Sequence, residues 1–182
     1  MARVVKKSLQ QAEPELSEVY QKIEKKFGKV PNIFLNMGNS LAALKGFLAL
    51  SEQTEKMTLA PKLREQIALA VSQENDCNYC LAAHCAASKQ LGLEEQQVMH
   101  ARQAQAEEKR EDAILKFAKL VVEKNGRVSG HEVEELKKAG VNDQEMVEII
   151  YLVMVNMFTN YFNHITDPDI DFPIAKEIAL EK

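Results

Sequence analysis

The sequence predicts a single all-α domain. Its 182 residues contain only seven glycines and five prolines, about half the usual frequency, which argues against the turn-rich all-β folds. Apolar residues recur at spacings of three and four through most of the chain, and no segment alternates apolar and polar residues with a period of two. A chain of this length can bury a sizeable core by itself, so we assign residues 1–182 to one domain.

Four amphipathic patterns precede the cysteines of the chain. They cover residues 15–27, 30–34, 41–50 and 62–73. Gly28 follows the first pattern as a C-terminal stop. Asn39 or Ser40 is placed to cap the third, and Pro61 stands in the first turn of the fourth. Residues 1–14 are a polar leader, which we expect to be flexible or exchanged between subunits.

Six further helical patterns follow, joined by short connections. They cover residues 77–91, 94–103, 109–124, 130–139, 143–164 and 174–180. Asn75 and Asp76 break the preceding helix and suit the N-cap of the next one. Gly92 closes the helix at 77–91, and Gly126 and Gly140 separate later helices.

The pattern at residues 143–164 differs from the others because apolar residues occupy nearly every face of the helix. A helix that is apolar all round is buried on all sides, and in a small chain this implies contacts with other subunits as well as an internal core. We therefore expect a homo-oligomer. The apolar positions are Met146, Val147, Ile149, Ile150, Leu152, Val153, Met154, Val155, Met157 and Phe158.

Charge and hydropathy exclude several classes of partner. The net charge of −4 and the isoelectric point near 5.7 argue against a nucleic-acid-binding surface. The N-terminus has no apolar run that would make a secretory signal. The most apolar stretch, 149–158, is about half of the ~20 residues that cross a bilayer. We therefore expect a cytoplasmic protein that binds neither nucleic acid nor membrane.

A cluster of chemically reactive side chains lies in the second quarter of the chain. Cys77, Cys80 and His84 are separated by three and four residues, which puts all three on one stripe of a helix. Unpaired backbone N–H groups at a helix N-terminus favour a thiolate there. His84 is placed to receive or relay a proton, and Glu65 on the preceding helix to orient and polarise His84.

Such a set supports two-electron thiol chemistry. A thiolate attacks a peroxide O–O bond and becomes a sulfenic acid, which the neighbouring thiol converts to a disulfide. Cys80, nearer to His84, is the better candidate for the attacking thiolate and Cys77 for the resolving thiol, although the reverse order remains open. An external dithiol must then reduce the disulfide. The sequence carries no haem, flavin or nicotinamide signature, and we expect no resident cofactor or metal.

A structural zinc site is the main alternative for these residues. Cys77, Cys80 and His84 with Glu65 or Cys85 would supply four ligands. Structural zinc usually draws its ligands from two separate loops, however, and here three of them share one helix. A c-type haem needs a histidine directly after the second cysteine, where this chain has Leu81.

Three further residues are assigned mainly to packing. Tyr79 lies between the two cysteines and lines a pocket or simply packs. Cys85, flanked by alanines and pointing about 100° away from His84, is expected to be a small core residue. His164 ends the apolar helix beside Asn160 and Asn163, where we expect a satisfied, partly buried histidine.

At these residues the sequence resembles the carboxymuconolactone decarboxylase superfamily, in its alkylhydroperoxidase D-like branch. The family motif is a glutamate, a Cys-x-x-Cys pair twelve residues later, and a histidine after three more positions, which Glu65, Cys77, Cys80 and His84 match. Residues 160–165 and 171–173 are similar to the peroxidase-related subgroup.

The resemblance implies an all-helical homo-oligomer, a trimer or hexamer, in which Cys80 is the peroxidatic thiol and Cys77 the resolving thiol. It implies Glu65 and His84 as the proton relay, and a lipoyl- or thioredoxin-type reductant. One position departs from the well-studied pattern, because Tyr79 stands where that pattern has a histidine. The decarboxylase branch, whose members are lyases, generally lacks the cysteine pair. A thiol-disulfide exchange protein without peroxide specificity is a further alternative.

Overall fold

The computed structural model describes residues 2–178. Within them the chain forms nine α-helices and one short 3₁₀ helix, with no strand, which confirms the predicted all-α class. In chain order they are η1 Leu9–Gln11, α1 Pro14–Phe27, α2 Asn32–Met37, α3 Leu41–Thr54, α4 Pro61–Glu74, α5 Asn78–Gln90, α6 Glu95–Arg102, α7 Lys109–Glu123, α8 Gly130–Lys138 and α9 Asp143–Thr166. No helix of this part of the chain has the length and apolarity needed to span a bilayer.

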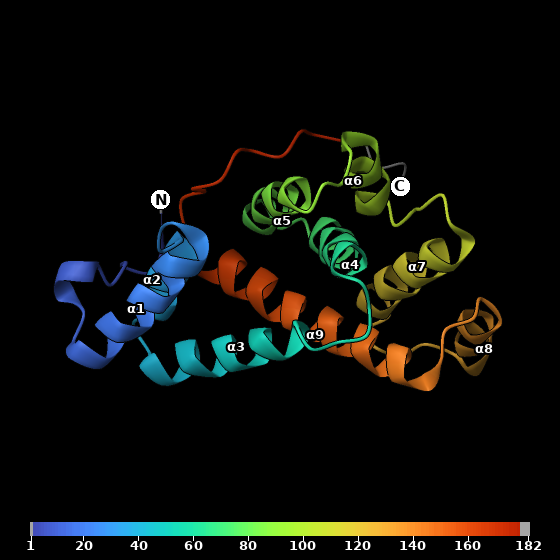
Figure 1. The fold of residues 1–182 in the computed structure, drawn as a ribbon, viewed down its shortest axis with the longest axis horizontal. Coiled ribbons are helices and arrows are strands. Elements are labelled where there is room, and N and C mark those ends of the chain that lie inside the picture. Colours follow the sequence, from blue (N-terminus) through green and yellow to red (C-terminus); the bar gives the residue numbers. More distant parts are fainter. Residues whose placement is uncertain (1, 179–182) are drawn as a thin grey trace.

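Helix α4 is the centre of the fold. It packs against α5, α6, α7 and α9, and α9 in turn packs against α3, α5 and α7. Figure 1 shows α9 running along the length of the molecule, with α8 at one end and α1 and α2 at the other. This arrangement places the N-terminal end of α5 between α4 and the C-terminal half of α9, where the reactive residues lie.

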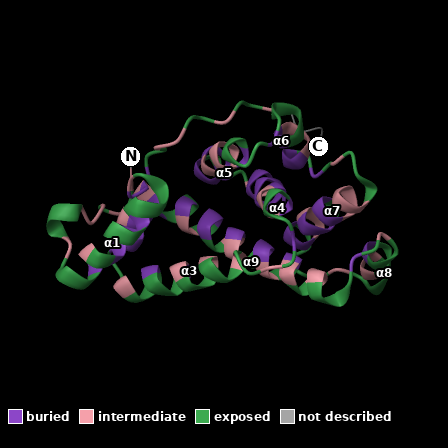
Figure 2. Cartoon of the chain, in the orientation of Figure 1, coloured by how far each residue is buried: buried purple, intermediate pink, exposed green. Residues whose placement is uncertain are grey.

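Buried residues, coloured purple in Figure 2, occur on most of the helices, and their side chains form two clusters. The larger joins α4, α6, α7 and α9, and its fully buried members include Ile67, Leu69, Val71, Ile114, Leu115, Ile149 and Val153. The smaller joins α1, α2 and α3 to the start of α5, and it includes Tyr20, Phe34, Leu44, Cys77, Tyr79 and Cys80. The two cysteines are therefore part of a packed apolar cluster rather than of an exposed loop.

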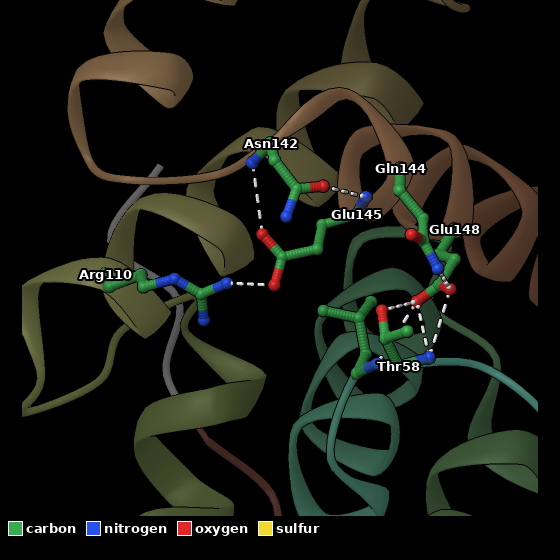
Figure 3. A network of polar contacts seen from close by, with 7 residues as sticks. Thr58, Arg110, Asn142, Gln144, Glu145 and Glu148 are labelled. Carbon is green, nitrogen blue, oxygen red and sulfur yellow. Dashed lines mark hydrogen bonds and ion pairs between the residues drawn. The ribbon is translucent and has the colours of Figure 1, made fainter.

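Polar contacts fix the first turns of α9 to its neighbours (Figure 3). The Glu148 carboxylate accepts hydrogen bonds from the Thr58 backbone N–H at 3.0 Å, the Thr58 hydroxyl at 2.9 Å and the Leu59 N–H at 3.1 Å. Glu145 pairs with Arg110 of α7. We call the contacts of Glu148 with the α3–α4 connection the Glu148 clamp. They hold the long helix in one register against α4.

The predicted helix at residues 174–180 is wrong for residues 174–178, which form no helix, and its last two residues lie outside the described part. A helix of so few residues is not stable by itself, and tertiary contacts decide the conformation. Arg102 donates from Nη1 to the Lys176 carbonyl oxygen at 2.6 Å. We call residues 167–176 the C-terminal strap. Figure 1 shows it running from the end of α9 across α5 toward α6.

The polar leader lies against its own chain in the structure. The Arg3 N–H donates to the Thr166 carbonyl oxygen at 2.8 Å, and the Lys7 N–H to that of Leu35 at 3.0 Å. Lys6 forms an ion pair with Asp169 of the strap at 2.9 Å. The leader thus contacts α2 and residues near the C-terminus. Its mobility or exchange between subunits stays a prediction.

Candidate active site

A tight turn between α4 and α5 places the cysteine pair. Asp76 adopts a left-handed conformation with φ of 51°, and the Cys77 N–H then donates to the Ser72 carbonyl oxygen at 2.9 Å. Cys77, rather than Asn75 or Asp76 as predicted, is the N-cap of α5, because its own sulfur accepts the Cys80 N–H at 3.4 Å. Asp76 forms the turn and so is not available to cap.

The two sulfur atoms are adjacent. Cys77 Sγ donates to Cys80 Sγ over 2.8 Å, and both cysteines are free thiols. They are almost completely buried, with exposed fractions of 1% for Cys77 and 3% for Cys80. A disulfide between them would form with little backbone movement, because residues i and i+3 of one helical turn already place both side chains together.

Their environment separates the acidities of the two thiols. The hydrogen bond from Cys77 lowers the pKa of Cys80, burial opposes it, and the charge of His84 with the amides of Asn163 and Asn160 lowers it further, to about 6. The hydrogen bond to Cys80 and burial raise the pKa of Cys77. At neutral pH the pair therefore consists of a Cys80 thiolate that accepts a hydrogen bond from the Cys77 thiol.

His84 and Glu65 meet across the α4–α5 contact. The His84 Nδ1 atom lies 2.8 Å from Glu65 Oε2, and the two side chains are each 24% exposed. Burial alone would lower the pKa of His84, but the charge of Glu65 and the hydrogen bond to it, together with the Cys80 sulfur, raise it overall. Glu65 thus fixes the ring and favours its protonated form, and a hydrogen bond with the Asn156 side chain acts in the same direction.

Helix α9 contributes asparagines to the site. From the sequence we expected two of them, Asn160 and Asn163, only as neighbours of His164. The Nδ2 atom of Asn163 donates to Cys80 Sγ at 3.1 Å. Asn160 accepts a hydrogen bond from the Asn75 side chain at 2.9 Å and its amide also lowers the pKa of Cys80. Asn156, one turn earlier, favours protonated His84. Asparagines spaced by four and three residues on an otherwise apolar helix were the signal that could have located them.

His164 itself is exposed, so the expectation of a partly buried histidine is wrong. It lies on the outer face of α9, beside exposed Tyr161 and Ile165. Both of its predicted neighbours are buried, Asn160 at 0% and Asn163 at 4% exposure. Successive residues of a helix are about 100° apart, so the burial of Asn163 did not extend to His164 next to it in sequence.

The hydroxyl of Tyr79 is tied to the C-terminal strap. Its hydroxyl donates to Asp171 Oδ1 at 2.7 Å and accepts the Ile33 N–H at 3.2 Å. Phe172 packs edge-on against the Tyr79 ring, with centroids 5.7 Å apart. Burial and the hydrogen bond to Asp171 raise the pKa of Tyr79. Its single proton is committed to Asp171, so Tyr79 is in no position to replace a relay histidine.

Cys85 and the cavities of the structure lie apart from this site. Cys85 is half-buried against the larger cluster, and burial raises the pKa of its thiol. It lines a cavity of about 290 Å³ between α5, α6 and the strap, and a second cavity of about 230 Å³ shares Arg102 with it. Neither cavity is lined by the cysteine pair. Among residues 2–178, no three His, Cys, Asp or Glu side chains gather closely enough to hold a metal ion.

One family of known proteins matches a segment of the chain. The model of the carboxymuconolactone decarboxylase family matches residues 42–123, which contain both cysteines, Glu65 and His84. No curated protein matches the chain significantly.

Solved structures resemble the chain over most of its length. An uncharacterised peroxidase-related protein from Silicibacter sp. TM1040 is 27% identical, with a TM-score of 0.78 over 88% of this chain and 90% of that one. A peroxidase-related protein from Ralstonia eutropha JMP134, described as an alkylhydroperoxidase AhpD core, gives 21% identity and a TM-score of 0.83 over 94% and 92% of the two chains.

The debrominase Bmp8 in complex with 2,3,4-tribromopyrrole shares the fold, with 22% identity and a TM-score of 0.80 over 94% of this chain and 92% of that one. The matched segment carries the Glu65, Cys77, Cys80 and His84 motif, and these similar structures extend the likeness over 88–94% of the chain. Residues 42–123 are therefore similar to the carboxymuconolactone decarboxylase family, and the chain shares its fold with alkylhydroperoxidase D-like, peroxidase-related proteins.

Proposed function

We propose that this protein is a thiol peroxidase that reduces hydrogen peroxide or organic hydroperoxides through a dithiol–disulfide cycle of Cys77 and Cys80. The observation that carries the proposal is the state of Cys80. Its sulfur accepts hydrogen bonds from Cys77 at 2.8 Å and from Asn163 at 3.1 Å, and its pKa lies near 6. A thiolate at neutral pH is the nucleophile that peroxide chemistry requires.

In the first step the Cys80 thiolate attacks the terminal oxygen of the hydroperoxide. An S–O bond forms, the O–O bond breaks, and Cys80 becomes a sulfenic acid while the alkoxide or hydroxide leaves. His84, held protonated by Glu65, donates the proton that turns this leaving group into an alcohol or water. Glu65 acts through His84 and is a positioning residue.

In the second step Cys77 resolves the sulfenic acid. The Cys77 sulfur attacks the Cys80 sulfur, the S–O bond breaks, and the hydroxyl leaves as water with the proton from Cys77. An external dithiol of the lipoyl or thioredoxin type then reduces the disulfide and is itself oxidised. The cycle needs no resident cofactor, because the electrons come from this donor.

Two other functions predict different behaviour. A lyase of the decarboxylase type would retain its activity when both cysteines are replaced by serine. A thiol-disulfide exchange protein would be oxidised by disulfides and show no preference for hydroperoxides. The low pKa of Cys80 fits either thiol reaction, while the protonated His84 beside it adds an acid for a leaving oxygen and favours the peroxidase.

The test is intact-mass and thiol analysis of reduced, metal-free protein after one equivalent of cumene hydroperoxide or hydrogen peroxide. We expect loss of two hydrogens within seconds, and digestion should locate a Cys77–Cys80 disulfide. Cys80→Ser should abolish the reaction, while Cys85→Ser is the matched control that leaves it unchanged. Unaltered thiols in the wild type, or full peroxide consumption by Cys80→Ser, would refute the proposal.

A further inference from the structure

One buried amide beside the reactive sulfur has an unused acceptor. Asn160 engages both ends of its side chain, through Asn75 at 2.9 Å and Ser72 at 3.4 Å. Asn163 is 4% exposed and donates from Nδ2 to Cys80 Sγ at 3.1 Å. Its Oδ1 atom is buried and makes no hydrogen bond. Buried polar atoms of this kind are rare because leaving them without a partner is costly.

The position of the Asn163 Oδ1 atom indicates which group would donate a hydrogen bond to it. Because Oδ1 and Nδ2 share one carbon, Oδ1 lies within about 5.5 Å of Cys80 Sγ. The missing partner must be a donor that arrives next to the sulfur. A hydroperoxide brings one, because the oxygen that a thiolate attacks carries a hydrogen. That hydrogen stays on the oxygen when the O–O bond breaks, so the sulfenic acid on Cys80 presents the same O–H group.

We propose that Asn163 is a catalytic residue with two functions: its Nδ2–H group holds the Cys80 sulfur as an anion, and its Oδ1 atom accepts the O–H of the bound hydroperoxide and then of the sulfenic acid. The inference rests on the proposed function and deepens it by naming what selects the substrate. Electrophiles that carry an O–H on the attacked atom gain a hydrogen bond that other electrophiles lack. The site is thereby specific for hydroperoxides.

Neighbouring groups account for the position of the amide. Asn163 lies on the inner face of α9, which packs against α4 and α5, and the Glu148 clamp fixes the other end of that helix. The side chain is thus held by the packing of α9 before any substrate arrives. Such preorganised donors and acceptors stabilise a reacting group more than mobile ones do.

The test separates the two functions of the amide. Asn163→Leu removes both donor and acceptor with little change in size, while Asn163→Asp keeps an acceptor and removes the donor. Asn36→Leu is the matched control, because Asn36 is also buried with an unpartnered amide but makes no hydrogen bond to either sulfur. For each protein, the pH profile of Cys80 alkylation by iodoacetamide is measured first, with peptide mapping to identify the alkylated cysteine.

The rate of Cys80 oxidation by hydrogen peroxide is then measured at a pH where Cys80 is fully ionised. In both Asn163 variants we expect the alkylation profile to move to higher pH, because the thiolate has lost a donor, and in Asn163→Asp it moves further because the new carboxylate repels the thiolate. In Asn163→Leu we expect oxidation to slow at least about tenfold more than alkylation, because only the peroxide loses the acceptor. Asn36→Leu should leave both measurements unchanged.

Unchanged pH profiles, or equal losses with peroxide and iodoacetamide, would overturn the inference even if the wild type forms the disulfide normally. A wild type that resists peroxide would instead refute the proposed function, and the alkylation profile would still test the donor by itself. If Asn163→Leu fails to fold, the isosteric Asn163→Asp variant provides the same comparison of pH profiles.

Discussion

At the scale of single residues, the site is a set of charges arranged so that each stabilises the next. Glu65 raises the pKa of His84, and His84 with the Cys77 thiol and the α9 amides lowers the pKa of Cys80 to about 6. An isolated cysteine is a thiol at neutral pH and an isolated histidine is mostly neutral, so both shifts depend on the neighbouring groups. The reactivity therefore belongs to the constellation rather than to one side chain.

The first prediction concerns the pH dependence of Cys80 oxidation by hydrogen peroxide. The rate should rise through pH about 6 as Cys80 loses its proton and fall again at higher pH as His84, whose pKa is raised, loses its own. In Glu65→Gln the alkaline limb should move to lower pH, because the carboxylate charge no longer supports the imidazolium. Stopped-flow rates between pH 4 and 10 check this, and an unmoved alkaline limb would contradict the role given to Glu65.

Replacing the imidazole itself tests the proton donor. His84→Asn should slow peroxide oxidation by roughly 10²- to 10⁴-fold, the usual contribution of general acid–base catalysis. The same variant should also raise the pKa of Cys80, because a positive charge beside the thiolate is lost. Oxidation and alkylation rates measured in parallel separate the two effects. A variant that oxidises at the wild-type rate would remove His84 from the mechanism.

Tyr79 provides a prediction of the opposite kind. Because its hydroxyl is bound to Asp171 of the strap, Tyr79→Phe should leave the rate of Cys80 oxidation within about threefold of wild type. It should instead lower the free energy of unfolding by about 1–3 kcal/mol, because the Asp171 carboxylate, a charged acceptor, loses the hydrogen bond from the Tyr79 hydroxyl. Urea unfolding measures the second effect. A large loss of oxidation rate with unchanged stability would show that Tyr79 belongs to the proton relay.

At the scale of the helices, the site depends on where α5 begins and on how α9 is held. The left-handed turn at Asp76 and the capping sulfur of Cys77 set the first residue of α5. The Glu148 clamp fixes α9 at the end farther from the cysteines. A shift of α9 by one residue would rotate Asn163 by about 100° and remove its amide from Cys80.

The Glu148 clamp should therefore make the stability of the protein depend on pH. Partial burial acts to raise the pKa of Glu148, but the hydrogen bonds from Thr58 and Leu59 outweigh it and lower the pKa overall. A carboxyl group whose pKa is lower in the folded state stabilises the fold above its unfolded pKa of about 4.3 and loses that contribution as pH falls through the folded value.

The matching variant is Glu148→Gln. It should unfold about 1–2 kcal/mol more easily than wild type at pH 7, because neutral acceptors bind N–H groups less strongly. The difference should shrink below pH 4, where the wild-type carboxyl also becomes protonated. Urea unfolding at pH 7 and pH 3.5 checks this, and a difference that does not change with pH would show that the charge of Glu148 is not what stabilises the clamp.

At the scale of the whole molecule, the outer face of α9 is apolar and exposed. Its six large exposed side chains follow the spacing of one helical stripe: Val147, Ile150, Met154, Phe158, Tyr161 and Ile165. Within one chain, only the inner face of α9 is buried. Burial on all sides, as expected from the sequence, would need contacts with another chain. Contiguous apolar stripes of this kind mark contacts between proteins, and we propose that a second copy of the chain covers this one.

The corresponding prediction is a homo-oligomer that depends on the stripe. Light scattering after gel filtration should give a mass that is a multiple of 20.5 kDa. The double variant Val147→Glu and Met154→Glu should be smaller, because two charges would be buried without partners. Lys22→Glu, an exposed change on α1, is the control that should leave the mass unchanged. A monomeric wild type would contradict the proposal.

The sequence by itself determined the helical class, most helix positions and the four residues of the Glu65, Cys77, Cys80 and His84 motif. These features depend on local spacing: apolar periodicity, caps and stops, and offsets that put side chains on one stripe of a helix. The contact between Glu65 and His84 was also foreseen, because two consecutive helices joined by a short turn pack side by side. The predicted N-cap of α5 was wrong by one or two positions, because Cys77 caps this helix in place of Asn75 or Asp76.

Only the tertiary structure decided which residues far along the chain join this motif. Asn163 reaches Cys80 from α9, and Asp171 of the strap binds the Tyr79 hydroxyl. The non-helical conformation of residues 174–178 and the exposure of His164 were likewise set by packing. Local periodicity states which face of a helix is apolar, but not which other helix that face meets or at what register. The amides around the thiolate therefore became visible only when α9 was placed against α4 and α5.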